Sequence, residues 1–163
     1  KINIKRSTIK TFASLELDQK ILKALEELEY KEPTEIQKKA IPVALKKRDI
    51  VAVAQSGTGK TAAFLLPILE ELIEQKQVNE LPILRALILV PTRELATQIA
   101  KAVDEYAKYL DVERLAVFGG VSVNEQTRKL SKGVEILVAT SGRLLEHLRN
   151  NTINLSSVST VVI

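Results

Sequence analysis

One short segment constrains this chain more than any other: Ala54-Gln55-Ser56-Gly57-Thr58-Gly59-Lys60-Thr61, which lies between an apolar stretch and an apolar helical pattern. It matches the phosphate-binding loop pattern, although Ala54 stands where the first glycine usually stands. Gly57 and Gly59 permit backbone angles that point several N–H groups at one phosphate. Lys60 is placed to bind the β- and γ-phosphates, and the Thr61 hydroxyl is suited to ligate Mg²⁺. The following helix adds its positive N-terminal end.

The alternative is a glycine-containing turn that merely joins a strand to a helix. Few such turns continue with Gly-Lys-Thr after an apolar strand, so the sequence favours a nucleotide site that also includes Ser56 and Thr58. The loop by itself does not specify the base of the nucleotide.

Apolar strands alternate with helical patterns along the rest of the chain. Strands are predicted at 49–54, 86–90, 114–118, 135–139 and 160–163, and helices at 15–28, 35–45, 60–75, 93–110, 122–130 and 141–149. Thr34 is placed to cap the second helix, and Pro67 should bend the third. Because the strands are apolar on both faces, we expect an α/β fold with a buried parallel sheet flanked by helices. A polar connection is expected at 77–84, and no interdomain linker is evident.

Composition excludes several classes of protein. The 163 residues suit one compact domain, and a hydrophobic content of 45% is enough to fill its core. No apolar run approaches the roughly 20 residues of a spanning helix, and the basic start KINIKRSTIK lacks the apolar core of a secretory signal. The absence of cysteine excludes disulfides and agrees with a cytoplasmic location. The net charge of +4 is compatible with a polyanionic partner.

Further motifs occur in order along the chain. Glu29 to Gln37 reads EYKEPTEIQ, Pro91 to Ala96 reads PTRELA, and the later motifs are Gly119-Gly120 and Thr140-Ser141-Gly142-Arg143. With the phosphate-binding loop, they closely resemble the DEAD-box ATP-dependent RNA helicase family over essentially the whole chain. The stretch FGGVS, which follows YAKYL, resembles the bacterial RhlE-type branch of that family.

The resemblance implies a P-loop, RecA-like fold, namely the N-terminal helicase ATP-binding domain, over residues 1–163. Residues 1–45 would carry the adenine-reading Q motif and an upstream aromatic residue, Phe12. It implies that Gln37 contacts adenine, which suits an amide with both a donor and an acceptor and would select ATP over GTP. Tyr30 would stack on the base, and Thr34 would hold the Q motif against the phosphate-binding loop. The alternative for Gln37 is a solvent-facing glutamine on a helix.

The same resemblance implies RNA contacts at residues that follow predicted strands, where ligands of open α/β sheets collect. These residues are Pro91, Thr92, Arg93, Gly119, Gly120, Thr140, Gly142 and Arg143. Glycines allow close backbone approach, arginine supplies charge, and threonine supplies a hydroxyl. Contacts of this kind address phosphate and sugar, so binding should be independent of sequence and weakened by salt. The alternatives are an ordinary helix-start arginine at Arg93 and ordinary tight turns at the glycines.

Two positions depart from the family pattern. Glu29 occupies the place of the glycine that normally opens the Q motif, which puts the local left-handed geometry in doubt. Ser141 replaces the proline of the TPGR motif, which should make the entry to the next helix less rigid.

In the family, the strand that resembles residues 160–163 runs into Asp-Glu-Ala-Asp, which holds Mg²⁺ and positions the attacking water. This chain contains neither those acids, nor the Ser-Ala-Thr motif, nor the second RecA-like domain with its arginine fingers. We expect a fragment or trimmed form of a helicase that binds ATP and RNA but neither hydrolyses nor unwinds, with Lys60 and Thr61 as its only catalytic residues. Because the Ser-Ala-Thr strand normally separates the phosphate-loop strand from the last strand, we also expect unpaired strand edges.

Other interpretations remain open. A non-catalytic P-loop module that binds a protein partner is the main alternative, whereas a P-loop kinase or GTPase would not explain PTRELA or the Q motif. His147 is expected at the surface, because no partner acid or nucleophile is in view. The basic run 46–48 is expected to be a solvated helix end, and Glu70, Glu71 and Glu74 a wet helix face.

Overall fold

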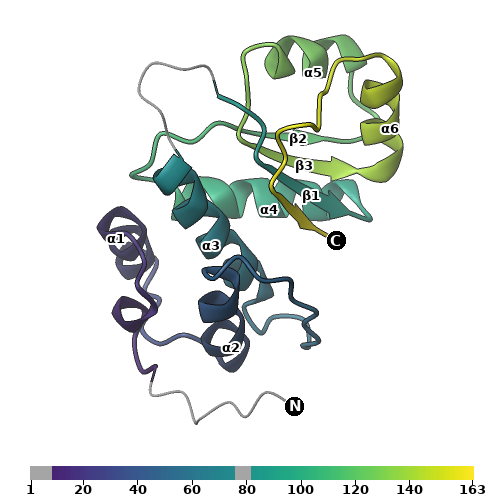
Figure 1. Cartoon of the computed structure of the whole chain (residues 1–163). Helices are drawn as coiled ribbons and strands as arrows, with labels where there is room; N and C mark the ends of the chain where they lie inside the picture. Colours follow the sequence, from purple (N-terminus) through teal and green to yellow (C-terminus); the bar gives the residue numbers. More distant parts are fainter. Residues whose placement is uncertain (1–8, 76–81) are drawn as a thin grey trace. The chain divides into compact units, whose positions relative to one another are not determined.

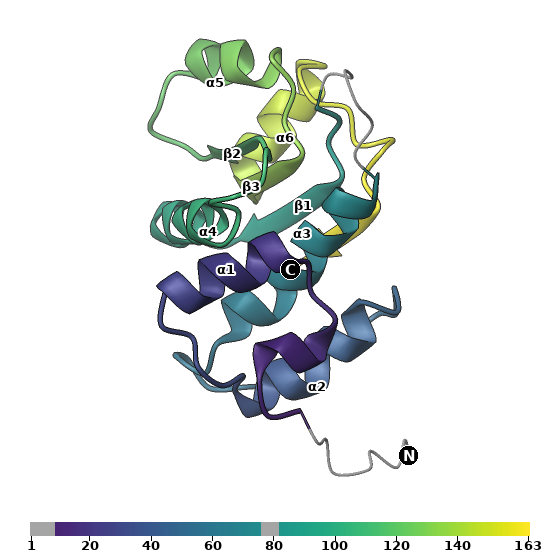
Figure 2. The same ribbon diagram turned by 90° about the vertical axis from the view of Figure 1, so that its left-hand side faces the viewer.

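The computed structural model describes residues 9–75 and 82–163. The chain forms two compact units: unit 1 comprises Lys1–Glu74 and Glu105–Leu110, and unit 2 comprises Gln75–Asp104 and Asp111–Ile163. The start of the chain and the first part of the predicted connection at 77–84 lie outside the described residues. Figures 1 and 2 show the helices and strands from two directions.

Unit 1 is helical, with a 3₁₀ helix η1 (Phe12–Leu15), α1 (Gln19–Glu27), α2 (Glu35–Ala44) and α3 (Lys60–Gln75). The helix predicted at 15–28 therefore begins later than expected. The cause is Asp18, which acts as the N-cap: its side chain accepts a hydrogen bond of 2.7 Å from the backbone N–H of Lys20. Leu15 belongs to η1 instead, and it is buried there together with Phe12.

Helix α1 ends in a left-handed turn at Glu29, whose φ is 58°. The Glu29 N–H donates to the carbonyl oxygen of Glu26 and the Tyr30 N–H to that of Leu25, both at 2.9 Å. This pair of bonds is the Schellman ending that glycine usually provides. The left-handed geometry of the Q motif is thus kept, although a side chain occupies a conformation that disfavours it.

The strand predicted at 49–54 does not form, and this prediction was wrong. Val51 and Val53 are 99% and 95% exposed, and residues 50–54 pair with no strand in the described ranges. An apolar run becomes a strand only where neighbouring strands complete its hydrogen bonds. Residues 50–54 have no such neighbours in the described ranges, so no strand forms there.

Unit 2 contains a four-stranded parallel sheet in the order β2-β3-β1-β4. Its strands are β1 (Ala86–Val90), β2 (Arg114–Val117), β3 (Ile136–Thr140) and β4 (Thr160–Val162). Each lies within one residue of its predicted bounds or matches them. Strands β1 and β3 pair with Val90 opposite Thr140, so they end at the same edge of the sheet. The parallel α/β fold predicted from the sequence is confirmed.

Helices cover both faces of this sheet. They are α4 (Arg93–Tyr106), α5 (Val123–Leu130) and α6 (Ser141–Arg149). Figures 1 and 2 show α4 on one face and α5 and α6 on the other. The core under α5 and α6 consists of Leu87, Leu115, Val117, Val134, Leu137, Ala139 and Leu144. Helix α4 ends at Tyr106 rather than at the predicted Leu110.

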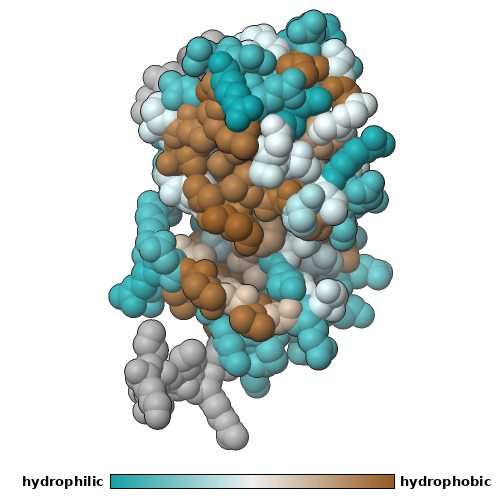
Figure 3. Space-filling model, turned by 90° about the vertical axis from the view of Figure 1, so that its right-hand side faces the viewer, coloured by the Kyte–Doolittle hydropathy of each residue, from teal (hydrophilic) through white to brown (hydrophobic). Residues whose placement is uncertain are grey.

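The last strand is less buried than its apolar sequence suggests. Val161 is half-exposed and Ile163 is 98% exposed, because β4 is an edge strand that, among the described residues, pairs only with β1. Figure 3 shows hydrophobic side chains (brown) gathered on the face of the molecule that is drawn there. In the described ranges, the large hydrophobic residues that are exposed are Tyr30, Val43, Ile50, Val51, Val53, Ile83, Leu145, Val161 and Ile163.

Candidate functional site

The phosphate-binding loop of unit 1 depends on left-handed glycines. Gly57 has φ 78° and Gly59 has φ 88°, and α3 begins immediately after them at Lys60. The Lys60 ammonium donates to the carbonyl oxygen of Ala54 at 2.6 Å, and the Thr58 hydroxyl donates to that of Gln55 at 2.7 Å. The loop therefore folds back on itself beside a helix N-terminus, which is a site suited to an anion.

Gln37 joins the Q motif to this loop. Its Nε2 donates to the carbonyl oxygen of Gly59 at 3.1 Å, and its Oε1 accepts from the backbone N–H of Thr34 at 2.8 Å. A Cβ at Gly59 would lie 2.4 Å from Gln37 Nε2 and 3.2 Å from Thr34 Oγ1, so only glycine fits. At 2% exposure, Gln37 is not the solvent-facing glutamine of the alternative interpretation, which was wrong.

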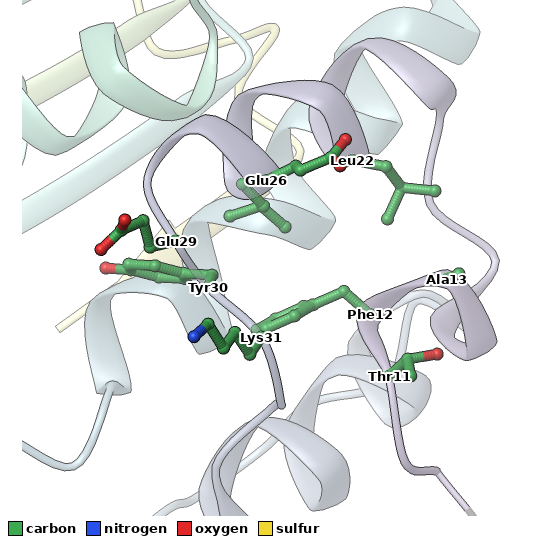
Figure 4. A pocket seen from close by; sticks show the side chains of 9 residues that line it. Thr11, Phe12, Ala13, Leu22, Glu26, Glu29, Tyr30 and Lys31 are labelled. Atoms are coloured by element: carbon green, nitrogen blue, oxygen red, sulfur yellow. The ribbon is translucent and has the colours of Figure 1, made fainter.

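Phe12 and Tyr30 meet in a cavity of about 470 Å³. Their ring centroids are 6.1 Å apart, and Figure 4 shows the two rings side by side with Glu29 and Lys31 nearby. Phe12 is buried, whereas Tyr30 is partly exposed. The structure thus brings the upstream aromatic residue, Phe12, against Tyr30, to which the resemblance assigns stacking on the base.

Tyr106 also belongs to this cluster, although the sequence alone assigns it no role beyond its place in the helix predicted at 93–110. Its hydroxyl lies 3.1 Å from that of Tyr30, and the two rings meet edge to face with centroids 5.9 Å apart. Burial, followed by the hydrogen bond with Tyr30, raises the pKa of Tyr106 above its ordinary value, so the phenol stays protonated. Only the tertiary fold reveals this pairing, because the two tyrosines are far apart in the sequence.

The residues present fit a nucleoside phosphate with Mg²⁺. The left-handed glycines precede the start of α3, and a Cβ at Gly59 would collide with the Gln37 side chain that packs against the loop. Lys60 would bind the phosphates, and the Thr61 hydroxyl in the first turn of α3 would ligate Mg²⁺ together with phosphate oxygens. Among the described residues, no group of three or more His, Cys, Asp or Glu side chains is arranged to hold a metal by itself.

In unit 2, the motifs that follow β1, β2 and β3 meet at the carboxyl edge of the sheet, the edge at which these strands end. Pro91, Thr92 and Arg93 follow β1, Gly119 and Gly120 follow β2, and Gly142 follows Thr140 at the end of β3. The pairings of Val90 with Thr140 and of Val117 with Ala139 bring these segments into one row.

Arg93 lies beside Gly120 at this edge. The Arg93 guanidinium lies over the Phe118 ring at 5.5 Å, and a Cβ at Gly120 would stand 3.7 Å from Arg93 Nη1. Gly120 has φ 83°, which favours glycine. The Thr92 hydroxyl is committed to the start of α4, where it accepts from the Leu95 N–H at 3.2 Å. An exposed cation beside exposed glycine backbone is an arrangement that suits a phosphate.

Arg143 does not join this exposed surface. Only 9% of the residue is exposed, and its Nη1 donates to the carbonyl oxygen of Val121 at 2.9 Å and to Gln126 Oε1 at 2.7 Å. Its Nε lies 2.9 Å from Glu146 Oε2. The sequence prediction of an RNA contact by this guanidinium is therefore corrected: the charge is directed into the protein.

His147 is also buried, so its expected surface position was wrong. Its Nδ1 lies 2.8 Å from the Thr152 hydroxyl and its Nε2 lies 3.1 Å from Gln126 Oε1. Burial and the nearby Arg143 charge lower the pKa of His147, while Glu146 opposes this shift. Sequence spacing gave no sign of these partners, which are supplied by α5 and by the turn after α6.

The charged residues expected to be solvated follow that expectation in part. Lys46, Lys47 and Arg48 are exposed after α2, and Lys47 Nζ lies 3.5 Å from Glu74 Oε2. Glu70 is not simply wet, since its Oε2 accepts from the Asp18 N–H at 2.7 Å. Burial raises the pKa of Glu70 despite that hydrogen bond.

Comparison with known proteins identifies the family of this chain. The DEAD/DEAH box helicase family profile matches residues 34–163. The ATP-dependent RNA helicase DeaD of Escherichia coli is 44% identical over 154 residues, which is 94% of this chain and 24% of that protein. The ATP-dependent RNA helicase CshA of Listeria monocytogenes is 41% identical over 152 residues, which is 93% of this chain and 28% of that protein.

The chain belongs to the DEAD/DEAH box helicase family, and it spans about a quarter of the length of these relatives. Its position in the RhlE-type branch stays a prediction. In the described ranges, no helix is both long enough and apolar enough to cross a membrane.

Proposed function

We propose that this chain is the ATP-binding and RNA-binding first domain of a DEAD-box ATP-dependent RNA helicase. The observation that carries the proposal is the buried Gln37 side chain, which donates to the carbonyl oxygen of Gly59 within the phosphate-binding loop. A base-reading motif and a phosphate-binding motif are thereby held in one piece of structure. Names of the relatives support the proposal, since DeaD and CshA are both ATP-dependent RNA helicases.

For the nucleotide, the phosphates would lie on the N–H groups of Ser56 to Thr61, with Lys60 as the cation and Thr61 toward Mg²⁺. The two hydrogen bonds of Gln37 within the protein use one N–H of its amide nitrogen and one lone pair of its amide oxygen. The second N–H and the second lone pair would bind the adenine edge. Tyr30, whose ring is partly exposed, would stack on the base, and Phe12 would pack against the Tyr30 ring. Thr34 would keep the Q motif against the loop.

For RNA, the contacts would come from the carboxyl edge of unit 2. Arg93 is its exposed cation, and the backbone of Gly119, Gly120 and Gly142 is open to a phosphate. Pro91, Thr92 and Thr140 complete the same row. Because these groups address phosphate and sugar, affinity should fall with salt and depend little on base sequence.

We propose further that the 163-residue chain alone neither hydrolyses ATP nor unwinds RNA. Its sequence holds no Asp-Glu-Ala-Asp segment, and a second RecA-like domain would have to supply the arginine that stabilises the transition state. That arginine alone contributes about 10³-fold or more in related phosphoryl-transfer enzymes. Strand separation by the purified chain with ATP would contradict this part of the proposal. A cytoplasmic location also stays a prediction.

The test is a titration of the purified chain with fluorescent ADP and GDP in the presence of Mg²⁺. We expect ADP to bind more tightly than GDP, Lys60→Ala to lose both nucleotides, and Gln37→Ala to lose adenine selectivity. Lys39→Ala, at an exposed position of the same helix as Gln37, is the matched control and should bind like the unaltered chain. Equal binding of both nucleotides would overturn the Q-motif assignment.

A non-catalytic module that binds a protein partner is the second candidate. The observation that favours it is the exposure of Val51 and Val53 in an apolar segment without strand neighbours in the described ranges. Failure to bind either nucleotide would move this candidate ahead.

A further inference from the structure

Two buried side chains hold the two ends of the Gly119-Gly120 turn. Gln126 Nε2 donates to the carbonyl oxygen of Phe118 at 3.2 Å, and Arg143 Nη1 donates to the carbonyl oxygen of Val121 at 2.9 Å. These two carbonyls flank the glycine pair on either side. In the described ranges, the N–H groups of Gly119 and Gly120 make no hydrogen bond of their own.

The two side chains also bind each other, and this fixes the orientation of the Gln126 amide. Arg143 Nη1 donates to Gln126 Oε1 at 2.7 Å. Because a guanidinium only donates, the atom that faces it must be the amide oxygen, which leaves the amide nitrogen for Phe118. Glu146 partners the remaining side of the guanidinium through Nε at 2.9 Å, so the buried charge is compensated.

His147 completes the network, and counting donors assigns its tautomer. Gln126 Oε1 accepts from Arg143, so His147 Nε2, at 3.1 Å from the same oxygen, must also donate to it. In the neutral ring, Nδ1 is then an acceptor that faces the Thr152 hydroxyl at 2.8 Å. That hydroxyl also lies 3.0 Å from the His147 carbonyl oxygen, and it donates to either of the two acceptors.

We propose that Gln126 and Arg143, here called the loop clamp, are positioning residues that set the Gly119-Gly120 turn for RNA phosphate without touching RNA. This inference rests on the proposed RNA-binding function and deepens it. Glycine loses more conformational freedom on ordering than any other residue, so a turn with two glycines is costly to fix at the moment of binding. A turn whose two ends are already held presents its N–H groups beside Arg93 at a smaller cost.

The clamp differs from a direct contact in how binding responds to salt. A side chain that neutralises a phosphate releases counterions, so its loss lowers the salt dependence of binding by about one charge. The loop clamp lies inside the protein and would release none. Clamp variants should therefore weaken RNA binding at every salt concentration while leaving the slope of log affinity against log salt unchanged.

The experiment compares four ¹⁵N-labelled chains: the unaltered chain, Gln126→Leu, Arg143→Lys and Arg149→Lys. Arg149 is exposed on the same helix as Arg143, so Arg149→Lys is the matched control. Affinity for a fluorescein-labelled ten-nucleotide oligouridylate is measured over a salt series. Amide spectra without RNA follow Gly119 and Gly120, and the β1 signals report whether the fold is intact.

We expect both clamp variants to bind RNA about tenfold more weakly with an unchanged salt slope. The reason is that the entropic cost of ordering the Gly119-Gly120 turn would then be met when RNA binds rather than when the chain folds. Their Gly119 and Gly120 signals should shift or broaden while those of β1 stay in place, and the control should match the unaltered chain. Arg143→Lys keeps the buried charge and is the milder change, so it remains informative if Gln126→Leu does not fold.

Unchanged glycine signals in a folded clamp variant would overturn the inference. A reduced salt slope in an Arg143→Gln variant, which lacks the charge that Arg143→Lys keeps, would also overturn it, since the arginine would then act as a direct charge. An equal loss of affinity in Arg149→Lys would overturn it as well, since arginine in general would then be responsible. If the unaltered chain binds no RNA, the proposed RNA function fails. The glycine signals then still decide whether the clamp orders the turn.

Discussion

Two apolar segments of this chain have nearly the same sequence character and opposite structures. Residues 50–54 read IVAVA, and β3 (Ile136–Thr140) reads ILVAT. The second is buried between β1 and β2, whereas the first forms no strand, with Val53 95% exposed. Composition therefore supplies the tendency to form a strand, but pairing with at least one neighbouring strand decides whether the strand forms.

The two candidate sites differ in a related way. The phosphate-binding loop of unit 1 is local: its left-handed glycines and the start of α3 are continuous in sequence, and one distant side chain, Gln37, is added. The carboxyl edge of unit 2 is assembled by strand register from three separated segments. The first site should therefore respond to changes in its own backbone, and the second to changes in the support behind it.

The largest effect should separate the two apolar segments. Val138→Asp buries a carboxylate at the centre of the sheet and should cost more than about 4 kcal/mol in the free energy of unfolding. Val53→Asp, at an exposed position, should change it by less than about 0.5 kcal/mol. Chemical denaturation followed by circular dichroism measures both, and a large loss in Val53→Asp would show that this segment is buried in solution.

The next effect concerns the two glycines of the phosphate-binding loop. Both have positive φ, which costs an alanine about 1–2 kcal/mol, but only at Gly59 would a Cβ also collide, at 2.4 Å from Gln37 Nε2. We expect Gly57→Ala to weaken ADP binding about tenfold and Gly59→Ala about a hundredfold, since each 1.4 kcal/mol is tenfold. Titration with fluorescent ADP measures this order, and the reverse order would mean that Gln37 does not contact the loop in solution.

A smaller effect should appear with pH, because burial holds the pKa of His147 below its ordinary value. As the pH falls from 7 to 5, the unfolded chain takes up a proton at this imidazole while the folded chain resists it. Stability should therefore fall over this range. His147 is the only histidine in the sequence. In the His147→Asn variant, the melting temperature should therefore depend less on pH between pH 7 and pH 5 than in the unaltered chain. Identical pH profiles for the two chains would contradict the assignment.

The smallest effect should be a gain in stability. Glu29→Gly places glycine in the left-handed turn after α1, where Glu29 has φ 58°. Because glycine removes the steric cost of that conformation, unfolding should require about 1 kcal/mol more free energy. Glu26→Gly, within the same helix, is the control and should destabilise by about 1 kcal/mol. A loss of stability in Glu29→Gly would show that this turn is not left-handed in solution.

The sequence predicted features that depend on local periodicity. Helix α3 and strand β1 were predicted at their observed residues, since α3 has a helical apolar pattern that begins after Gly59 and β1 is an apolar run that ends before Pro91. Prediction from the sequence failed where contacts with distant residues determine whether a side chain is buried or a strand forms. His147 and Arg143 have the composition of a helix surface, and only the position of Gln126 on α5 shows that they are buried partners. The unpaired segment 50–54 failed for the same reason, because a sequence does not display its missing neighbours.

The most direct test of two separate sites is an amide-resolved titration of the ¹⁵N-labelled chain, first with ADP and Mg²⁺ and then with oligouridylate. We expect ADP to shift the signals of residues 55–61 and of Gln37, and RNA to shift those of Arg93, Gly119, Gly120 and Gly142. Shifts from both ligands at the same residues, or RNA shifts confined to the phosphate-binding loop, would contradict the assignment of two separate sites.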